Sequence, residues 1–280
     1  MIIWLASYPK SGNTWLRMFL KSYYQKPGAK FNLEKTVHDD FKTHSGFPDL
    51  NALKHLKVDY SKFSDIVRNW ETLQDYINLN GRTNFLKKQN SMCTVGPYKF
   101  TTSKNTKGGI YLVRDPRDVL VSYSNHTGYD HETTFKHMCN SDNYESTSTE
   151  IKDKIFYRSL LGSWANHYNS WKSFKSAKIL IIKYEDMIAD TYNTFKKIIR
   201  YLGEIDDLKL DEEKLNDAIK QTEFKELQKL EKKQGFSEKG AGSLFFRKGN
   251  AGSWKDELSS NLIERVEKIF SREMIELGYL

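Results

Sequence analysis

Apolar runs alternate along the chain with amphipathic segments, which is typical of strands alternating with helices. Short apolar runs at residues 2–5, 109–113 and 178–184 predict three buried strands. A polar loop and then an amphipathic stretch follow each run. This alternation predicts a three-layer α/β/α fold, in which a central parallel sheet carries helices on both faces. We expect the three loops to meet beyond the carboxyl ends of the strands, where such folds bind ligands.

Helical periodicity predicts most of the remaining elements. The expected helices span residues 14–25, 60–79, 116–126, 155–174, 185–202 and 261–277, and a further short strand spans residues 85–89. The C-terminal third is expected to be helical except at its glycine-rich stretch, residues 235–252. The rest of residues 26–84 is aromatic-rich and irregular. No linker or repeat divides the chain, so residues 1–280 are predicted to form a single domain.

Charge and cysteine content limit the functional classes. The formal net charge of +8 permits anionic partners, although lysine and glutamate at helical spacing, as in residues 225–233, also fit a solvated helix face. The aromatics are not interleaved with basic clusters, which argues against nucleic acid. Two cysteines, Cys93 and Cys139, imply no disulfide framework and favour a reducing compartment. Neither a leader pattern nor an apolar stretch of about 20 residues is present, so we expect a cytoplasmic protein without a membrane partner.

The loop after the first strand carries the strongest chemical signal. Residues 8–15 read Tyr-Pro-Lys-Ser-Gly-Asn-Thr-Trp and join a strand to a helix. Such a turn directs backbone N–H groups and a helix N-terminus at one spot, which suits a phosphate. Because Lys10 precedes Gly12, the nucleotide-binding spacing G-x-x-x-x-G-K-[ST] is absent. The loop is therefore predicted to bind phosphate without being an ordinary ATPase loop.

Two further motifs accompany this loop. Residues 112–123 read Leu-Val-Arg-Asp-Pro-Arg-Asp-Val-Leu-Val-Ser-Tyr, and residues 245–255 read Phe-Phe-Arg-Lys-Gly-Asn-Ala-Gly-Ser-Trp-Lys. In this order, the three motifs resemble those of the cytosolic-type sulfotransferases. The resemblance implies a P-loop-like sulfotransferase fold and transfer of a sulfuryl group from 3′-phosphoadenosine 5′-phosphosulfate (PAPS) to a hydroxyl or amine acceptor. It also implies the product 3′-phosphoadenosine 5′-phosphate (PAP) and no metal.

The resemblance assigns the first motif to the 5′ side of the cofactor. It implies binding by Lys10, Ser11, Gly12, Asn13, Thr14 and Trp15. Lys10 would also contact the bridging oxygen and stabilise charge on the leaving group. Thr14 would hydrogen-bond the 5′-phosphate and Trp15 would stack on adenine. Core packing is the alternative for Trp15.

The other motifs would form the 3′-phosphate and adenine sites. The residues implied are Arg114, Ser122, Phe246, Arg247, Lys248 and Gly249 for the phosphate side, with Tyr184, Thr222 and Phe224 at adenine. A guanidinium and a hydroxyl eight residues apart, across a strand-to-helix turn, suit one phosphate. The alternatives are an Arg114–Asp118 ion pair, a basic surface turn at 247–249, and ordinary packing or capping at Tyr184 and Thr222. Arg117 and Asp118 also fit helix capping.

The segment expected to hold the catalytic base departs from the family. The family's K-T-H sequence is replaced by Lys87-Lys88-Gln89, and glutamine does not accept a proton near neutral pH. Lys87 keeps the family's lysine and Gln89 stands at the base position. Lys42-Thr43-His44 spells the motif but lies in an irregular connection, where His44 also fits a surface loop. A carboxylate such as Asp39 or Asp40 is a further candidate base.

Three functions therefore remain open from the sequence. The first is a PAPS-dependent sulfotransferase acting on a small-molecule or glycan acceptor, and the second is an impaired protein that binds PAPS or PAP without transfer. A P-loop kinase is the third, and the missing G-K-[ST] counts against it. The acceptor would be selected by residues 26–84 and 127–155. The family's dimer motif survives only at Lys255 and Glu264, so the oligomeric state stays open.

Overall fold

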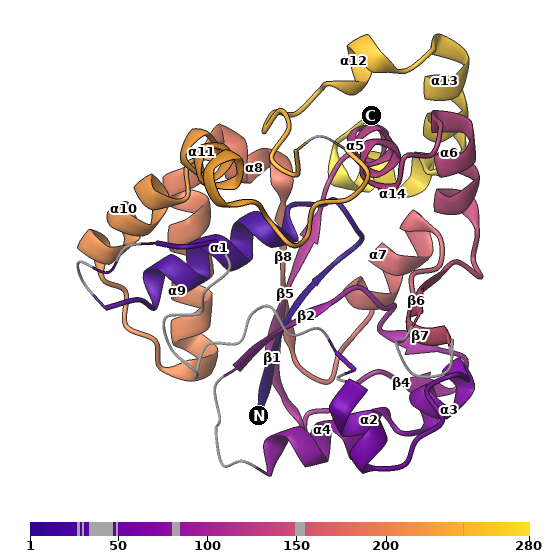
Figure 1. The fold of residues 1–280 in the computed structure, drawn as a ribbon, viewed down its shortest axis with the longest axis vertical. Coiled ribbons are helices and arrows are strands. Elements are labelled where there is room, and N and C mark those ends of the chain that lie inside the picture. The colour runs from indigo at the N-terminus through magenta and orange to yellow at the C-terminus, as the bar shows by residue number, and fades with distance from the viewer. Residues whose placement is uncertain are drawn as a thin grey trace. The chain divides into compact units, whose positions relative to one another are not determined.

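The computed structural model of the chain describes residues 1–26, 29, 31–33, 47–48, 50–79, 85–148, 155–242 and 244–280. Figure 1 shows the helices and strands with their labels. The chain divides into two compact units. Unit 1 comprises Met1–Tyr8, Lys42–Tyr111 and Met138–Ile181, and unit 2 comprises Pro9–Phe41, Leu112–His137 and Ile182–Leu280. No helix in these described ranges is long and apolar enough to cross a membrane.

Unit 1 contains most of the central sheet. Its strand order is β2-β1-β5-β8, with β1 at Ile2–Ser7, β2 at Phe85–Gln89, β5 at Thr106–Val113 and β8 at Lys178–Lys183. β1 and β2 are parallel, with Ile2 opposite Phe85 and Ala6 opposite Gln89. Every residue of β1 is buried, as expected of a strand covered on both faces. All four predicted strands are confirmed, although β5 begins three residues earlier than its apolar run.

Smaller elements complete unit 1. They are α2 (Leu50–His55), α3 (Phe63–Arg68), α4 (Trp70–Asn78), β3 (Thr94–Val95), β4 (Tyr98–Lys99), β6 (Tyr144–Ser148), β7 (Ile155–Leu160) and α7 (Trp164–Lys172). The single helix predicted over 60–79 is divided at Asn69, whose φ of −105° and ψ of 8° leave the helical region.

The prediction of one helix over residues 155–174 is wrong for its first part. Residues 155–160 form β7, which pairs antiparallel with β6. Gly162, at a φ of 62°, then ends the extended segment, and Ser163 caps α7 by accepting the N–H of Asn166. Ile-Phe-Tyr-Arg-Ser-Leu is as compatible with a strand as with a helix, and the pairing with β6 decides between them.

The core of unit 1 is aromatic. The Trp4 ring packs edge-on against Phe47 at 5.3 Å and Phe100 at 4.7 Å between centroids, and Trp70 lies 5.1 Å from Phe100. All four side chains are at most 1% exposed. Phe47 and Trp70, both within residues 26–84, are therefore core residues of unit 1.

Unit 2 is built from helices. They are α1 (Asn13–Tyr23), α5 (Pro116–Thr127), α6 (His131–Cys139, whose last two residues belong to unit 1), α8 (Tyr184–Ala189), α9 (Thr191–Asp206), α10 (Glu212–Gln221), α11 (Phe224–Gln234), α12 (Trp254–Glu257), α13 (Ser260–Ile269) and α14 (Ser271–Leu277). The helices predicted at 14–25 and 116–126 are confirmed. Those predicted over 185–202 and 261–277 are each divided in two, at Asp190 and Phe270.

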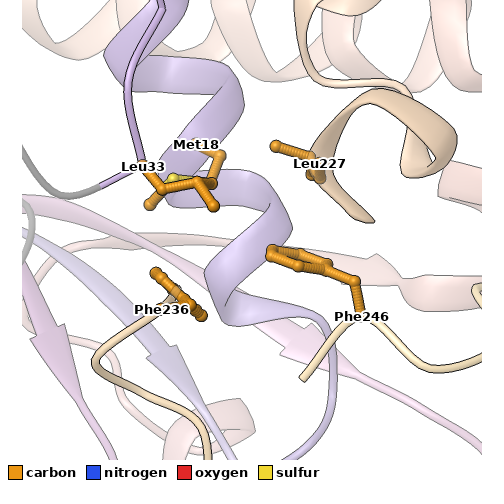
Figure 2. Close-up of a cluster of buried hydrophobic side chains, with 5 residues drawn as sticks. All are labelled: Met18, Leu33, Leu227, Phe236 and Phe246. Atoms are coloured by element: carbon orange, nitrogen blue, oxygen red, sulfur yellow. The ribbon is translucent and has the colours of Figure 1, made fainter. Parts of the chain in front are cut away.

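A hydrophobic cluster in unit 2 joins α1 to the glycine-rich stretch. Met18 of α1, Leu33, Leu227 of α11, Phe236 and Phe246 are buried together (Figure 2). Phe236 and Phe246 come from the segment between α11 and α12. The described residues of 235–252 thus lie outside regular helices, as predicted, but contribute two aromatic rings to the core of unit 2.

Candidate functional site

The first motif forms a helix N-terminus whose N-cap residue is a glycine, which supplies no capping side chain. Gly12 is the N-cap of α1 at a φ of 98° and a ψ of 5°. A Cβ atom at this position would lie 2.6 Å from Cδ2 of Tyr184. The turn therefore requires glycine at position 12 for two reasons. The backbone is left-handed there, and the Tyr184 ring leaves no room for a Cβ atom. A helix N-terminus without a side-chain cap is suited to an external anion.

Two polar side chains of this loop differ in their surroundings. The Lys10 Nζ lies 4.0 Å from the ring centroid of Phe245, in the third motif. Ser11 is completely buried, and its Oγ has no hydrogen-bond partner among the described residues. A buried hydroxyl without a hydrogen-bond partner lowers the stability of the folded protein by about 1–3 kcal/mol. A ligand that accepted a hydrogen bond from Ser11 would remove this penalty.

Thr14 belongs to a buried charge cluster that sequence reasoning missed. The Thr14 hydroxyl donates to the Glu238 carboxylate at 2.8 Å and accepts from Nη2 of Arg17 at 2.9 Å. Arg17 is 0% exposed, and its Nη2 lies 2.6 Å from Oε2 of Glu238. Arg17 shares its helix face with Thr14 and Lys21, so the sequence pattern suggests a solvated position, and nothing indicated its partner 221 residues away.

Arg114 brings the three loops together. Its Nη1 donates to the Lys10 carbonyl at 3.3 Å and its Nη2 to the Asn250 carbonyl at 3.1 Å. The guanidinium carbon lies 4.2 Å from the ring centroid of Tyr184, which follows β8. The predicted convergence of the loops is thereby confirmed within unit 2. The Nε of Arg114 is buried and has no hydrogen-bond partner among the described residues.

The Arg114–Asp118 ion pair is present but long. Nη2 of Arg114 lies 3.9 Å from Oδ2 of Asp118. The same carboxylate accepts the N–H groups of Gly252 at 2.7 Å and Trp254 at 3.2 Å. Asp118 therefore anchors the third motif on α5. Ser122 lies one helical turn further along α5 and is partly exposed.

Arg117 is occupied by structural contacts. It bonds both oxygens of Asp115, one oxygen of Glu267 and the Tyr279 carbonyl, and it stacks on the Trp254 ring at 3.9 Å. Asp115 caps α5 by accepting the N–H of Arg117 at 2.9 Å. Of the charged residues in this first turn, Asp115 performs the capping that the sequence suggested for Arg117 and Asp118.

The basic residues of the third motif share one carboxylate. Glu257 lies 3.1 Å from Arg247 Nη2 and 2.8 Å from Lys248 Nζ. Burial alone would raise the pKa of Glu257, but these two hydrogen bonds outweigh it and hold the pKa below its ordinary value. Gly249 has a φ of 65°, and a Cβ there would lie 2.1 Å from the Phe224 ring. Glycine thus permits close contact between this turn and α11.

Three of the four residues expected at adenine, namely Trp15, Tyr184 and Thr222, lie in one area of unit 2. The indole N–H of Trp15 donates to the Thr222 carbonyl at 2.9 Å, and its ring meets Tyr184 edge-on at 6.1 Å. The Thr222 hydroxyl donates to the Ala218 carbonyl at 2.6 Å, which is a helix-terminal contact. Trp15 remains partly exposed, whereas Tyr184 is buried, which raises the pKa of its phenol.

The base segment belongs to unit 1 and is described by its backbone. Lys87 and Gln89 lie in β2 opposite Trp4 and Ala6, and the side chains of this strand lie outside the described part. His44, Asp39 and Asp40 also lie outside the described residues. No group of three or more histidine, cysteine, aspartate or glutamate side chains in the described ranges could hold a metal ion.

Unit 1 also contains a buried histidine that the sequence did not single out. Nδ1 of His167 lies 2.8 Å from the Tyr111 hydroxyl, and Nε2 lies 2.7 Å from the Asn90 carbonyl. Burial lowers the pKa of His167 to about 4, so the ring is neutral near pH 7. It ties the end of β2 to β5 and α7.

Comparison with known proteins identifies the family. The model of the sulfotransferase domain family matches residues 2–278. The chain belongs to the sulfotransferase domain family. The matched range runs through both compact units, and the predicted α/β class with a central parallel sheet is confirmed by solved structures of the same fold.

Relatives of this sulfotransferase-family chain are distant. Rat sulfotransferase 2A1 is 33% identical over 174 residues, which cover 59% of this chain and 56% of the rat protein, little more than half its length. Human sulfotransferase 2A1 is 29% identical over 98% of this chain and 84% of its own. Mouse sulfotransferase SULT7A1 complexed with PAP has a TM-score of 0.61 at 20% identity, and retinol dehydratase with androsterone and PAP has 0.60 at 19%. These two alignments cover 98% of this chain and 84% and 80% of those structures.

Proposed function

We propose that this chain is a PAPS-dependent sulfotransferase that transfers a sulfuryl group to a hydroxyl or amine acceptor. The observation that carries the proposal is the junction of three motifs in unit 2. There Arg114 contacts the carbonyls of Lys10 and Asn250 and the Tyr184 ring, beside the uncapped N-terminus of α1. Membership of the sulfotransferase family and the PAP-bound structures of the same fold support this assignment.

The residues present fit an adenosine nucleotide that carries anionic groups at both its 5′ and its 3′ positions. Ser11 Oγ and Arg114 Nε are buried donors without partners in the described ranges, and phosphate oxygens would satisfy both. The glycine turns at 12 and 249 let backbone approach closely. We propose that the cofactor site comprises Lys10, Ser11, Gly12, Asn13, Thr14, Trp15, Arg114, Ser122, Tyr184, Thr222, Phe224, Phe246, Arg247, Lys248 and Gly249.

Three cofactor-site side chains hold carboxylates in this structure. Thr14 donates to Glu238, while Arg247 and Lys248 pair with Glu257. A phosphate that takes these donors must outcompete the carboxylates. Because a phosphate carries more charge and more acceptor oxygens than a carboxylate, the exchange is electrostatically favourable.

The chain's own residues have distinct roles in the proposed reaction. PAPS supplies the sulfuryl group, and PAP is the second product. The Lys10 ammonium stabilises the negative charge that grows on the departing phosphate oxygen. Lys87 follows the family's lysine, and Gln89 cannot take the acceptor proton. We therefore propose that another group, with His44 as a candidate, acts as the base.

The names of the relatives indicate only a broad class of acceptor. Two further relatives, from guinea pig, are named 3-alpha- and 3-beta-hydroxysteroid sulfotransferases. We propose a small hydroxyl-bearing acceptor for this chain, with a glycan as the alternative, a single functional domain over residues 1–280, and a cytoplasmic location. A protein that binds PAPS or PAP without transfer is the rival, because Gln89 replaces the family's base.

The test combines binding and turnover. Calorimetry with PAP should give saturable binding that Mg²⁺ does not affect, and labelled PAPS should transfer its sulfuryl group to at least one member of a panel of phenols, steroids and sugars. PAP binding without transfer would support the rival. Mg²⁺-dependent consumption of ATP without PAP binding would indicate a kinase and overturn the proposal.

Restoring the family's base tests the position assigned to Gln89. If Gln89 stands at the base position and no other group takes the acceptor proton, Gln89→His raises the transfer rate by about 10²–10⁴-fold. If His44 already takes the proton, His44→Ala lowers the rate of the natural chain by about that factor and Gln89→His restores it in the His44→Ala variant. A rate that Gln89→His raises in neither background would show that residue 89 is not at the base position.

A further inference from the structure

The lysine of the first loop does not stand alone. The Lys10 Nζ lies 4.0 Å from the ring centroid of Phe245, well within the range of a cation–π contact. Such a contact contributes about 0.5–2 kcal/mol, increasing as the pair loses water. Lys10 has a long, flexible side chain that otherwise samples many rotamers. The Phe245 ring therefore lies against one side of the Lys10 ammonium.

The backbone of Phe245 is fixed by a buried carboxylate of α11. The N–H of Phe245 donates to Oε1 of Glu231 at 2.6 Å, and the N–H of Phe246 donates to Oε2 at 2.9 Å. Glu231 is only 4% exposed. Gln228, one turn earlier on α11, donates to the Phe246 carbonyl at 2.8 Å. The helix thus binds both the N–H and the C=O groups of this segment.

The side chain of Phe245 is also constrained. Its ring meets Phe236 edge-on at 5.2 Å and Phe246 at 5.1 Å between centroids. Phe236 and Phe246 belong to the buried cluster in Figure 2, which also contains Met18 of α1 and Leu227 of α11. Phe245 therefore presents its face to Lys10 from a rigid support.

We propose that Phe245, held by Glu231, is a positioning residue for Lys10. The ring aims the ammonium of Lys10 toward the phosphosulfate position, and α11 keeps the ring in place. This inference rests on the proposed role of Lys10 in sulfuryl transfer. The contact is measurable without turnover.

The first measurement observes the contact in the free protein. Lysines are labelled as [¹³C]dimethyl-lysine, which keeps their positive charge, and the Lys10 signal is assigned with Lys10→Arg. A ring current from Phe245 shifts this signal upfield. Phe245→Leu should move it to the position of exposed lysines, whereas Phe245→Tyr should retain the shift. Phe174→Leu, which removes a partly buried phenylalanine of unit 1, is the control and should also retain it.

The second measurement separates positioning from general stability. Phe245→Leu should lower kcat by about 2–30-fold, which corresponds to the loss of a cation–π contact, and change the Kd for PAP by less than about threefold. In a Lys10→Ala background the same substitution should have no further effect on kcat, because Phe245 acts through Lys10. A role in folding alone would lower kcat equally in both backgrounds.

The outcomes distinguish this inference from the proposed function. A Lys10 signal that is the same in the natural chain and in Phe245→Leu overturns the inference, and so does an additive loss of kcat in the Lys10→Ala background. Absence of PAP binding in the natural chain overturns the proposed function instead. The ring-current measurement still decides whether Phe245 positions the Lys10 ammonium in that case.

Discussion

Two helices of unit 2 begin directly after strands of the same sheet, and their N-termini are built in opposite ways. At α1 the N-cap is Gly12, which offers no side chain. At α5 the N-cap is Asp115, whose carboxylate accepts the N–H of Arg117, and Pro116 occupies the first turn. The N-terminus of α1 is therefore suited to an external anion, whereas the N-terminus of α5 is capped by the Asp115 carboxylate.

This contrast shows how one topology can recognise two phosphates by different means. The N–H of Asp115 also donates to a carboxylate, that of Glu185, at 3.0 Å. With these backbone donors occupied, the turn before α5 can offer an anion a side chain, and Arg114 is that side chain. We infer that the α1 turn binds its phosphate mainly with backbone groups and the α5 turn with a guanidinium.

The largest combined effect on stability and PAP affinity is expected at Gly12. Gly12→Ala places a Cβ at a φ of 98° and 2.6 Å from the Tyr184 ring. We expect a loss of about 2–5 kcal/mol in the free energy of unfolding and a fall of about 100-fold in PAP affinity, because the loop must move. Gly278→Ala is the matched control, since it has a φ of 69° with no atom within 4 Å. Calorimetry and chemical denaturation that gave equal losses for the two variants would refute a special role for the α1 turn.

Removing Arg114 should affect one phosphate selectively. Arg114→Met should weaken PAP binding by about 10–150-fold, because charge-assisted hydrogen bonds contribute about 1.5–3 kcal/mol. Binding of AMP, which lacks the 3′-phosphate, should change much less. Arg200→Met, at an exposed position of α9, is the control for net charge. A similar loss for both nucleotides, measured by calorimetry, would place Arg114 elsewhere than at the 3′-phosphate.

Removing the cap of α5 should reduce stability and spare binding. Asp115→Ala deletes the acceptor for the Arg117 N–H and also the buried carboxylate that pairs with the Arg117 guanidinium, so it should lower the free energy of unfolding by about 3–5 kcal/mol. Ser259→Ala removes the corresponding cap of α13 and provides a comparison. Denaturation curves measure the loss. If PAP affinity fell as far as in Gly12→Ala, the two turns would not differ as proposed.

The smallest effect concerns pH. Burial raises the pKa of Glu185, which accepts the Asp115 N–H and the Tyr279 hydroxyl. A carboxyl whose pKa is higher in the folded chain favours the folded state when protonated. Its contribution is therefore present at low pH and lost as pH rises from about 4.5 through the raised pKa. Glu185→Gln should remove this decline, as measured by denaturation between pH 4 and 7. An identical pH dependence of stability in the natural chain and in Glu185→Gln would contradict this prediction.

The pattern of apolar and polar residues correctly predicted those elements that depend on a few neighbouring residues. The apolar runs at 2–5, 109–113 and 178–184 became strands, and the loop from Tyr8 to Trp15 formed the expected turn into a helix. These features depend on burial periodicity and on glycine at fixed positions, which are properties of short segments. The family resemblance likewise rested on three contiguous motifs.

Tertiary structure decided whatever depends on a distant partner. Residues 155–160 are a strand because β6 pairs with them, and Arg17 tolerates complete burial because Glu238 reaches it. Glu231 looked like one more charge on the solvated helix face of residues 225–233, yet it is buried and binds two backbone N–H groups. The free energy of such a residue depends on which groups surround it after folding, and spacing along the chain carries no information about them. The sequence alone therefore predicted the anion-binding loop, while the contact between its lysine and the Phe245 ring required the fold.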